Sequence, residues 1–423
     1  MTEEFLHYIW KYRLFDNKNL QTQSGEPIEI IKPGEHNTDA GPDFFNARIK
    51  IGKTLWAGNA EIHVRASEWN NHNHNKDKAY DNAILHVVYE EDKKISRKNG
   101  EVLPTLVLKE RISRNIFEKY LDFKLSKSAI PCEKVIDTVS PFHISTWLDR
   151  MLTERLERKS TLVLEKLKQN KNNWEETFYQ LMARNFGFKL NAEPFELLAK
   201  SLPNTILAKH KDNFFQIEAL LFGQAGLLQK KLKDDYPLQL QKEYNYLRKK
   251  LSLNPIDTHL WKFLRLRPSN FPTIRLSQFA KLIFSSTHLF SKIIETEKTK
   301  DIRKLLSVET SPYWENHYMF DKTSVKKKKH FGDDAIDNVI INTIVPVLFI
   351  YGKQKRDEKY IDRALKFLEQ TKPEKNFIIT KWNSLNIKSI NAYQTQALIE
   401  LKNEYCTHKK CLSCGIGNKI LSK

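Results

Sequence analysis

The spacing of apolar residues changes near residue 110, and this change limits the folds open to the chain more than any other feature. Before it, short runs rich in β-branched residues are separated by turn residues. The chain is predicted to begin with an amphipathic helix over residues 3–15. After it, such runs predict strands over residues 27–32, 44–51, 55–65, 83–89 and 103–108. After it, apolar residues recur at helical spacing, as in residues 145–168 and 174–186. The sequence therefore predicts an α+β protein, with a small mixed sheet followed by a large, mostly helical region.

The length of the chain predicts more than one domain. Its 423 residues exceed the ~100 to 200 residues that are typical of a single domain. We place an α/β domain at residues 1–125, a helical domain at 126–325 and a helical C-terminal region at 326–423. The last boundary lies at a run of four lysines, 326–329, which predicts an exposed loop before an apolar helix over residues 335–349.

The charge of the chain indicates the kind of partner. Lysine and arginine number 70 against 51 acidic residues, which gives a net charge of +19. Phosphate contacts release condensed counterions, so this excess favours a nucleic acid as the partner. A lysine-rich surface without an anionic partner is the alternative. The sequence leaves the oligomeric state open.

Neither a membrane nor secretion is expected. The nearest approach to the ~18 to 20 apolar residues of a spanning helix is residues 339–350, which Asn342 and Pro346 interrupt. The first four residues are acidic in character, unlike a secretory signal. We therefore expect a cytoplasmic protein.

The best candidate site lies in the hairpin predicted over residues 44–65. Asp43 opens its first strand, and Glu61 and His63 lie near the end of its second strand, on one face by strand alternation. Two carboxylates from neighbouring strands suit Mg²⁺ or Mn²⁺, and His63 would orient the attacking water. Ordinary surface carboxylates are the alternative.

The register of this hairpin decides whether the two carboxylates meet. A two-residue turn at residues 52–53 would set Asp43 opposite Ile62, with its side chain on the face away from Glu61. A β-bulge shifts the alternation by one residue and would bring the two carboxylates together. We expect this bulge at Gly58, because glycine inside a strand often marks one.

A histidine-rich segment follows the hairpin at residues 69–77. Its His72, His74 and Asp77 have donor atoms that could ligate a transition metal, line a substrate groove or cap the next helix. With Arg65 at the end of the hairpin, we expect these three residues to form the substrate-binding wall of the site.

A second basic segment lies at residues 265–275, where two prolines restrict the backbone. Its Arg267, Asn270 and Arg275 are candidates to bind phosphate or carboxylate groups. A loop that caps the next helix is the alternative.

The cysteines indicate a metal rather than disulfides. Cys406, Cys411 and Cys414 have Cys-x4-Cys-x2-Cys spacing, which lets thiolates converge on one ion. The fourth ligand would be Cys132 or, locally, His408. Zinc and an iron–sulfur cluster both suit thiolate ligands, and three buried thiols without a metal are the alternative.

The hairpin residues resemble the motif of the PD-(D/E)XK nuclease superfamily. Asp43, with the proline before it, and Glu61 match the two acids, and His63 stands where the superfamily usually has lysine. The predicted element order of helix, strand, strand, strand, helix, strand also matches. The resemblance implies a restriction-endonuclease-like fold, Mg²⁺ or Mn²⁺ at the two acids, and a further acid from Glu4 or Glu3. Some nucleases of this superfamily hold an iron–sulfur cluster with one remote and three C-terminal cysteines.

The chain also resembles, over nearly its whole length, a family of bacterial proteins of unknown function. The segments that carry this resemblance are 37–44, 58–63, 69–77, 219–226, 267–272 and the terminal cysteine segment. This resemblance implies no activity. The sequence thus predicts a metal-dependent, nuclease-like phosphodiesterase that acts on nucleic acid, and the alternative is a non-catalytic nucleic-acid-binding or scaffold protein.

Overall fold

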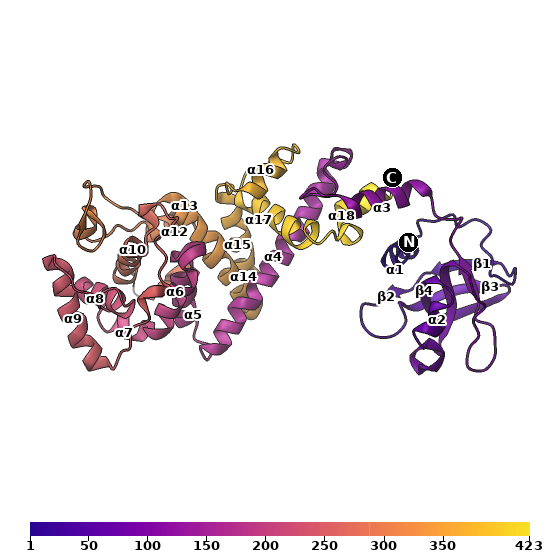
Figure 1. Ribbon diagram of the computed structural model, residues 1–423, viewed down its shortest axis with the longest axis horizontal. Helices are drawn as coiled ribbons and strands as arrows, with labels where there is room; N and C mark the ends of the chain where they lie inside the picture. Colours follow the sequence, from indigo (N-terminus) through magenta and orange to yellow (C-terminus); the bar gives the residue numbers. More distant parts are fainter. Residues whose placement is uncertain (287) are drawn as a thin grey trace. The chain divides into compact units, whose positions relative to one another are not determined.

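The computed structural model of the protein describes residues 1–286 and 288–423, which form two compact units. Unit 1 combines residues 1–147 with residues 402–423, and unit 2 consists of residues 148–401. Figure 1 shows the mixed sheet of the first part of the chain and the helices that follow it. The predicted α+β class is therefore confirmed. The finer division into three segments stays a prediction.

Unit 1 begins with helix α1 (Glu3–Tyr12), which packs against strand β4 of a six-stranded sheet. Five strands follow the order β1-β3-β4-β5-β6, and β2 pairs with β3. The pairs on either side of β3 are antiparallel, whereas β5 lies parallel to both of its neighbours. The strands are β1 (Ile28–Lys32), β2 (Glu35–His36), β3 (Phe44–Ile51), β4 (Thr54–Arg65), β5 (Ala83–Glu90) and β6 (Thr105–Val107).

The hairpin of β3 and β4 contains the expected bulge, but the bulge lies in β3 rather than at Gly58. The register changes by one residue between Phe44 and Ala47, where Asn46 has a φ of 56°. Asparagine tolerates this left-handed conformation better than most residues do. Gly58 has another role, since a Cβ atom there would lie 2.4 Å from Cγ2 of Ile84 on β5.

The bulge at Asn46 gives a testable prediction. Asn46→Val should lower the free energy of unfolding by about 1 to 2 kcal/mol, because a β-branched residue resists positive φ. For a unit of this size, that loss corresponds to a drop of about 2 to 8 °C in melting temperature. Asn46→Gly is the control and should stay within about 1 °C of the wild type. Equal melting temperatures for the two variants would contradict the assignment of the bulge.

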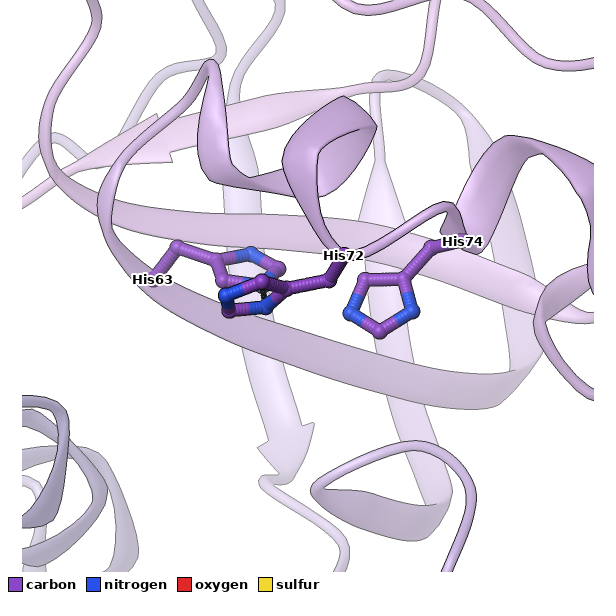
Figure 2. A group of neighbouring side chains, drawn as sticks. All are labelled: His63, His72 and His74. Carbon is purple, nitrogen blue, oxygen red and sulfur yellow. Dashed lines mark hydrogen bonds between the residues drawn. The ribbon is translucent and has the colours of Figure 1, made fainter.

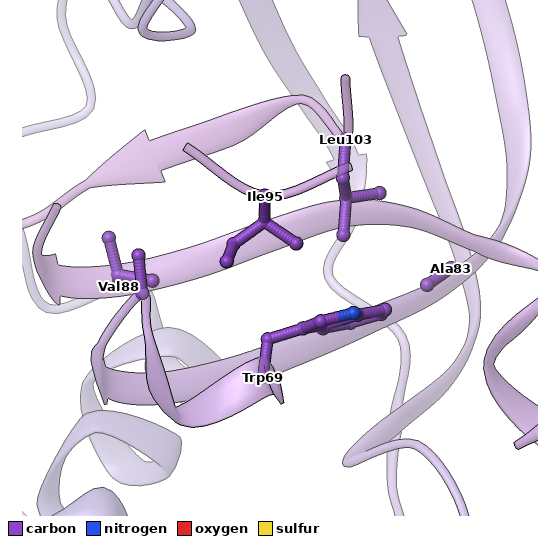
Figure 3. Packing of buried hydrophobic residues seen from close by; sticks show 6 residues of the cluster. Trp69, Ala83, Val88, Ile95 and Leu103 are labelled. Carbon is purple, nitrogen blue, oxygen red and sulfur yellow. The ribbon is translucent and has the colours of Figure 1, made fainter. Parts of the chain in front are cut away.

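A cluster of buried apolar side chains holds the segment between β4 and β5 against the sheet (Figure 3). Trp69, in helix α2 (Glu68–Asn71), is one of its members. Its ring centroid also lies 5.5 Å from that of His74 and 5.3 Å from that of His86. The cluster therefore positions the histidine-rich segment. Its members are Ala66, Trp69, Ala83, Val88, Ile95 and Leu103.

The rest of unit 1 joins distant parts of the chain. Helix α18, at the end of the chain, packs against α3 and against η3, where η denotes a short 3₁₀ or π helix. The further elements of unit 1 are η1 (His74–Lys76), η2 (Lys78–Tyr80), α3 (Arg114–Leu125), η3 (Ile136–Thr138), the first residues of α4 (Pro141–Gln169), η8 (Leu401–Cys406), η9 (Cys411–Ser413) and α18 (Gly415–Leu421).

Unit 2 is built from helices, with one short hairpin that the sequence did not predict. Strands of two or three residues are too short to show an alternating pattern. Besides most of α4, its elements are α5 (Trp174–Phe186), α6 (Phe188–Ser201), α7 (Asn204–Ala208), α8 (Phe214–Gln224), α9 (Asp235–Leu251), η4 (Thr258–Leu260), η5 (Pro268–Asn270), α10 (Pro272–Ser285), α11 (Leu289–Glu295), α12 (Thr299–Leu306), η6 (Pro312–Glu315), β7 (His317–Met319), β8 (Lys322–Thr323), α13 (Asp333–Val339), η7 (Ile340–Ile344), α14 (Val345–Lys355), α15 (Glu358–Gln370), α16 (Phe377–Asn383) and α17 (Ala392–Glu400).

One helical run in unit 2 is longer and more apolar than the sequence led us to expect. Asp333–Lys355 is long and apolar enough to span a membrane by length and composition alone. Pro346 does not end this run, because it follows the π-helical turn η7 and lies in the first turn of α14. Since 83% of the most apolar window is buried inside the protein, the run has the character of a core helix. The cytoplasmic location stays a prediction.

The lysine run at residues 326–329 is exposed at its first three positions, as expected, but Lys329 is buried. Its ammonium group donates hydrogen bonds to the backbone oxygens of Trp314 and Glu315. It also lies 4.2 Å from the ring centroid of Tyr318. Lys329 is therefore a structural residue of unit 2.

Candidate functional site

The bulge in β3 sets Asp43 beside Glu61 on the neighbouring strand. The Asp43 backbone N–H donates a 3.0 Å hydrogen bond to Glu61 Oε2, and the Ile62 N–H donates a 2.9 Å bond to Asp43 Oδ2. Glu61 is buried, whereas Asp43 keeps 22% of its side chain exposed. The structure therefore brings together the two acids that the sequence singled out.

His63 lies on the same face of β4 as Glu61, and both side chains are buried. Its Nδ1 lies 2.9 Å from Nε2 of His86, which β5 places next to Glu61 in the parallel register. Burial and the surrounding imidazoles lower the pKa of His63 to about 2, and burial lowers that of His86 to about 3. Both rings are therefore neutral near pH 7.

His72 and His74 approach this face from the segment after β4 (Figure 2). His63 Nε2 lies 3.2 Å from His72 Nδ1, and His74 Nε2 lies 3.2 Å from Glu61 Oε1. Asn73, with a φ of 61°, reverses the chain between His72 and His74. The histidine-rich segment thus lies beside the two acids, and its role as a substrate-binding wall stays a prediction.

Helix α1 contributes a residue that sequence reasoning missed. His7 Nε2 lies 3.1 Å from Asp43 Oδ2. Burial lowers the pKa of His7, but the hydrogen bond and the charge of Asp43 outweigh burial, so the pKa is raised. Burial also raises the pKa of Glu61, against a hydrogen bond from His74, and the Asp43 charge raises it further. The acids and imidazoles of this face are thus electrostatically coupled.

Of the two acids at the start of α1, Glu3 is half-buried and Glu4 is exposed. Burial raises the pKa of Glu3, with further contributions from Glu68 and Asp43, so its carboxylate lies within their electrostatic reach. Which of Glu3 and Glu4 supplies the further acid stays a prediction.

Two other residues expected at the substrate-binding wall lie at its edge. Asp77 is exposed and caps η2, where its carboxylate accepts a 2.9 Å hydrogen bond from the Ala79 N–H. Arg65 is the exposed last residue of β4, and its backbone N–H donates to Glu68. The structure thus gives Asp77 the capping role that the sequence left open.

The predicted Arg267, Asn270 and Arg275 belong to unit 2. Arg267 is exposed at the start of η5, but Arg275 is buried. The Arg275 guanidinium donates a 2.6 Å hydrogen bond to Asn270 Oδ1 and lies 4.6 and 4.9 Å from the ring centroids of Phe188 and Phe331. Asn270 and Arg275 therefore stabilise the loop before α10, but the N-cap residue of that helix, Phe271, makes no side-chain capping hydrogen bond.

All four cysteines belong to unit 1 and form a second cluster. Cys132, Cys411 and Cys414 are buried, and Cys406 is half-buried. Cys132 lies within electrostatic reach of Cys411 and Cys414, and Cys406 within reach of the other three. Burial raises the pKa of Cys132 and of Cys411 to about 12. The structure thus places Cys132 within electrostatic reach of the C-terminal cysteines.

Two glycines let the terminal segment pack closely in this cluster. A Cβ atom at Gly417 would lie 2.2 Å from the backbone oxygen of Cys411, and one at Gly415 would lie 2.5 Å from the ring of Trp147. His143 Nε2 also lies 3.0 Å from the Gly415 backbone oxygen. His408, the alternative fourth ligand, is exposed.

Comparison with known proteins assigns the chain to a family. A family model described as protein of unknown function (DUF2851) matches residues 3–377. The chain belongs to the DUF2851 family. No curated protein and no solved structure gives a significant match.

The DUF2851 match covers both halves of the candidate site, with Asp43 and Glu61 on the strands and the histidines after them. It ends before Cys406, so the three terminal cysteines of this DUF2851 member lie outside the matched residues. Two site residues, His7 and His86, were not predicted as part of the site. The sequence around each residue could have indicated its position, since His7 is one helical turn from Glu3 and His86 lies in a buried strand.

Proposed function

We propose that this protein is a metal-dependent, nuclease-like phosphodiesterase that acts on nucleic acid. The observation that carries the proposal is the position of Asp43 beside Glu61, linked by two hydrogen bonds between adjacent strands. Carboxylates in such a position are the ligands that Mg²⁺ or Mn²⁺ takes from protein, while water and substrate phosphate complete the shell. A bound cation would stabilise charge on the phosphate and favour deprotonation of water.

The residues around the two acids have roles that follow from their geometry. His63 is neutral, so it can accept a hydrogen bond from water but cannot supply the fixed charge of the lysine that the nuclease superfamily usually has there. His7 holds Asp43 Oδ2 at 3.1 Å and so orients that carboxylate. Glu3 lies within electrostatic reach of Asp43 and would supply a third acid.

Two further observations support the proposal. Apart from the two-residue strand β2 and the short 3₁₀ helices η1 and η2, the chain order α1, β1, β3, β4, α2, β5 agrees with the helix, strand, strand, strand, helix, strand order of the PD-(D/E)XK superfamily that the hairpin resembles. The net charge of +19 favours an anionic polymer as the substrate. The fold-level likeness alone would not identify a substrate.

We also propose that the four cysteines hold a structural metal centre, either zinc or an iron–sulfur cluster. The supporting observation is that Cys132 lies within electrostatic reach of Cys411 and Cys414, although more than 270 residues separate them in the chain. Such a centre would fasten the end of the chain to unit 1.

The enzymatic proposal is tested by incubating the full chain with supercoiled plasmid, RNA and single-stranded DNA. We expect cleavage of at least one substrate with Mg²⁺ or Mn²⁺, its loss in EDTA, and its return when the cation is restored. Protein that binds these nucleic acids without cutting any of them, with either cation, would contradict the proposal and support the non-catalytic alternative.

A further inference from the structure

The imidazoles of His63, His72 and His74 lie close together at the edge of the candidate site (Figure 2), and the Glu61 carboxylate lies beside two of them. One ring nitrogen from each of His63, His72 and His74 lies within 4.8 Å of the other two. Glu61 Oε1 lies 3.2 Å from His74 Nε2 and 3.8 Å from His63 Nε2. The four side chains therefore direct donor atoms toward a common space.

Two of the separations match those between the ligands of a small metal ion, whereas that between Glu61 Oε1 and His63 Nε2 is longer, at 3.8 Å. Bonds of about 2.0 to 2.1 Å at tetrahedral angles place neighbouring donor atoms about 3.3 Å apart. The distance from His63 Nε2 to His72 Nδ1 is 3.2 Å, as is that from His74 Nε2 to Glu61 Oε1. The centroids of the three rings form a nearly regular triangle, with sides of 5.1, 5.3 and 5.4 Å.

We propose that His63, His72, His74 and Glu61 bind a transition-metal ion of the zinc class. Imidazole nitrogen suits zinc, iron and nickel, whereas Mg²⁺ takes oxygen ligands. This inference names the cation of the proposed active site as a transition metal. The ion has a catalytic role only if the proposed function holds. Glu61 would then be shared between the acid pair and the histidines.

The surrounding side chains hold these ligands in place. His63 and Glu61 lie on the buried strand β4, and His63 Nδ1 faces His86 Nε2 at 2.9 Å. A hydrogen bond from His63 Nδ1–H to His86 leaves the lone pair of Nε2 free for a metal, as partners of ligating histidines commonly do. The His74 ring stacks on Tyr80 with a centroid distance of 3.8 Å. These contacts therefore fix the orientations of the His63 and His74 rings.

The alternative to a metal site is a chain of neutral imidazoles joined by hydrogen bonds. Measuring the metal content of the protein distinguishes these two arrangements. The full chain is stripped with chelator, loaded with zinc and dialysed, and bound zinc is measured per chain. The test variant is His72→Ala with His74→Ala, because His72 is exposed and His74 half-buried, so their loss leaves the buried core intact. His259→Ala removes an exposed histidine of unit 2 and is the control.

We expect the wild type and His259→Ala to bind one zinc ion more than the double variant. Zinc held by the cysteines is common to all three proteins and cancels in the difference. The single variant His74→Ala should bind this ion at least about 10- to 100-fold more weakly, and circular dichroism would confirm the fold of each variant. Equal zinc content in the wild type and the folded double variant would overturn the inference.

Failure of this inference is distinguishable from failure of the proposed function. Loss of one zinc ion from the double variant, with no nucleic acid cut by the wild type, supports the metal site and refutes the enzyme. Unchanged zinc content, with full Mg²⁺-dependent cleavage by the double variant, refutes the histidine site and leaves the acid pair as the catalytic centre.

Discussion

Asp43→Asn and Glu61→Gln should each reduce metal-dependent cleavage by roughly 10² to 10³-fold, which corresponds to about 3 to 4 kcal/mol of transition-state stabilisation. Each substitution keeps the shape of the side chain but removes the charge that would hold the cation. The effect is measured as the cleavage rate at saturating Mn²⁺, on the substrate that the wild type cuts best.

Asp39→Asn is the matched control, because Asp39 is exposed in the loop that leads to β3. It should keep the wild-type rate. Cleavage that survives both Asp43→Asn and Glu61→Gln would show that the activity belongs to another site or to a contaminant.

Cys411→Ser should remove the metal of the cysteine cluster and lower the melting temperature by about 10 °C or more. The free energy of a structural metal site contributes directly to folding, and about 5 kcal/mol lost from a unit of this size corresponds to such a drop. Metal content and thermal unfolding are measured on the same preparation. A brown protein with broad visible absorption would indicate an iron–sulfur cluster rather than zinc.

Two variants identify the fourth ligand of this cluster. Cys132→Ser should behave like Cys411→Ser, because the structure places Cys132 within electrostatic reach of the C-terminal cysteines. His408→Ala, at an exposed position, should leave metal content and stability unchanged. The reverse pattern would make His408 the ligand, and wild-type protein prepared without oxygen that contains no metal would refute the cluster.

The sequence predicts the elements of unit 1 well where the signal is local. Strand β3 begins and ends at the predicted residues, and β1, β4 and β5 differ from prediction by one residue at an end. The alternation of residues 44–51 and the turn after them are properties of neighbouring residues. Counting residues along both strands from this turn also showed that a bulge is needed to bring Asp43 and Glu61 together.

The position of the bulge could not be predicted, because it depends on a backbone angle. Asn46 and Gly58 are both plausible bulge residues, and only the structure shows that Asn46 has positive φ while Gly58 gives room to Ile84. Similarly, adjacent residues of a helix point about 100° apart, so the choice between Glu3 and Glu4 depends on the docking of α1 on the sheet. The contact of α1 with β4 joins residues that are far apart in the sequence, so the sequence pattern does not reveal it.

Burial explains the other differences. The sequence suggested that Arg275 and Lys329 are surface cations, but both are buried in unit 2. The charged group of each lies over an aromatic ring, and it donates a hydrogen bond to an amide oxygen (Arg275) or to backbone oxygens (Lys329). Long basic side chains can be buried when such partners are present. Which basic residues have them depends on packing between distant helices.

The central claim is that the face of the sheet around Glu61 binds a catalytic metal, and anomalous diffraction tests it most directly. Crystals soaked with Mn²⁺ or Zn²⁺ should give an anomalous peak about 2.0 to 2.2 Å from a Glu61 carboxylate oxygen, with Asp43 or the histidines completing the shell. Well-ordered crystals at saturating metal, with no peak within bonding distance of Glu61, would contradict the account.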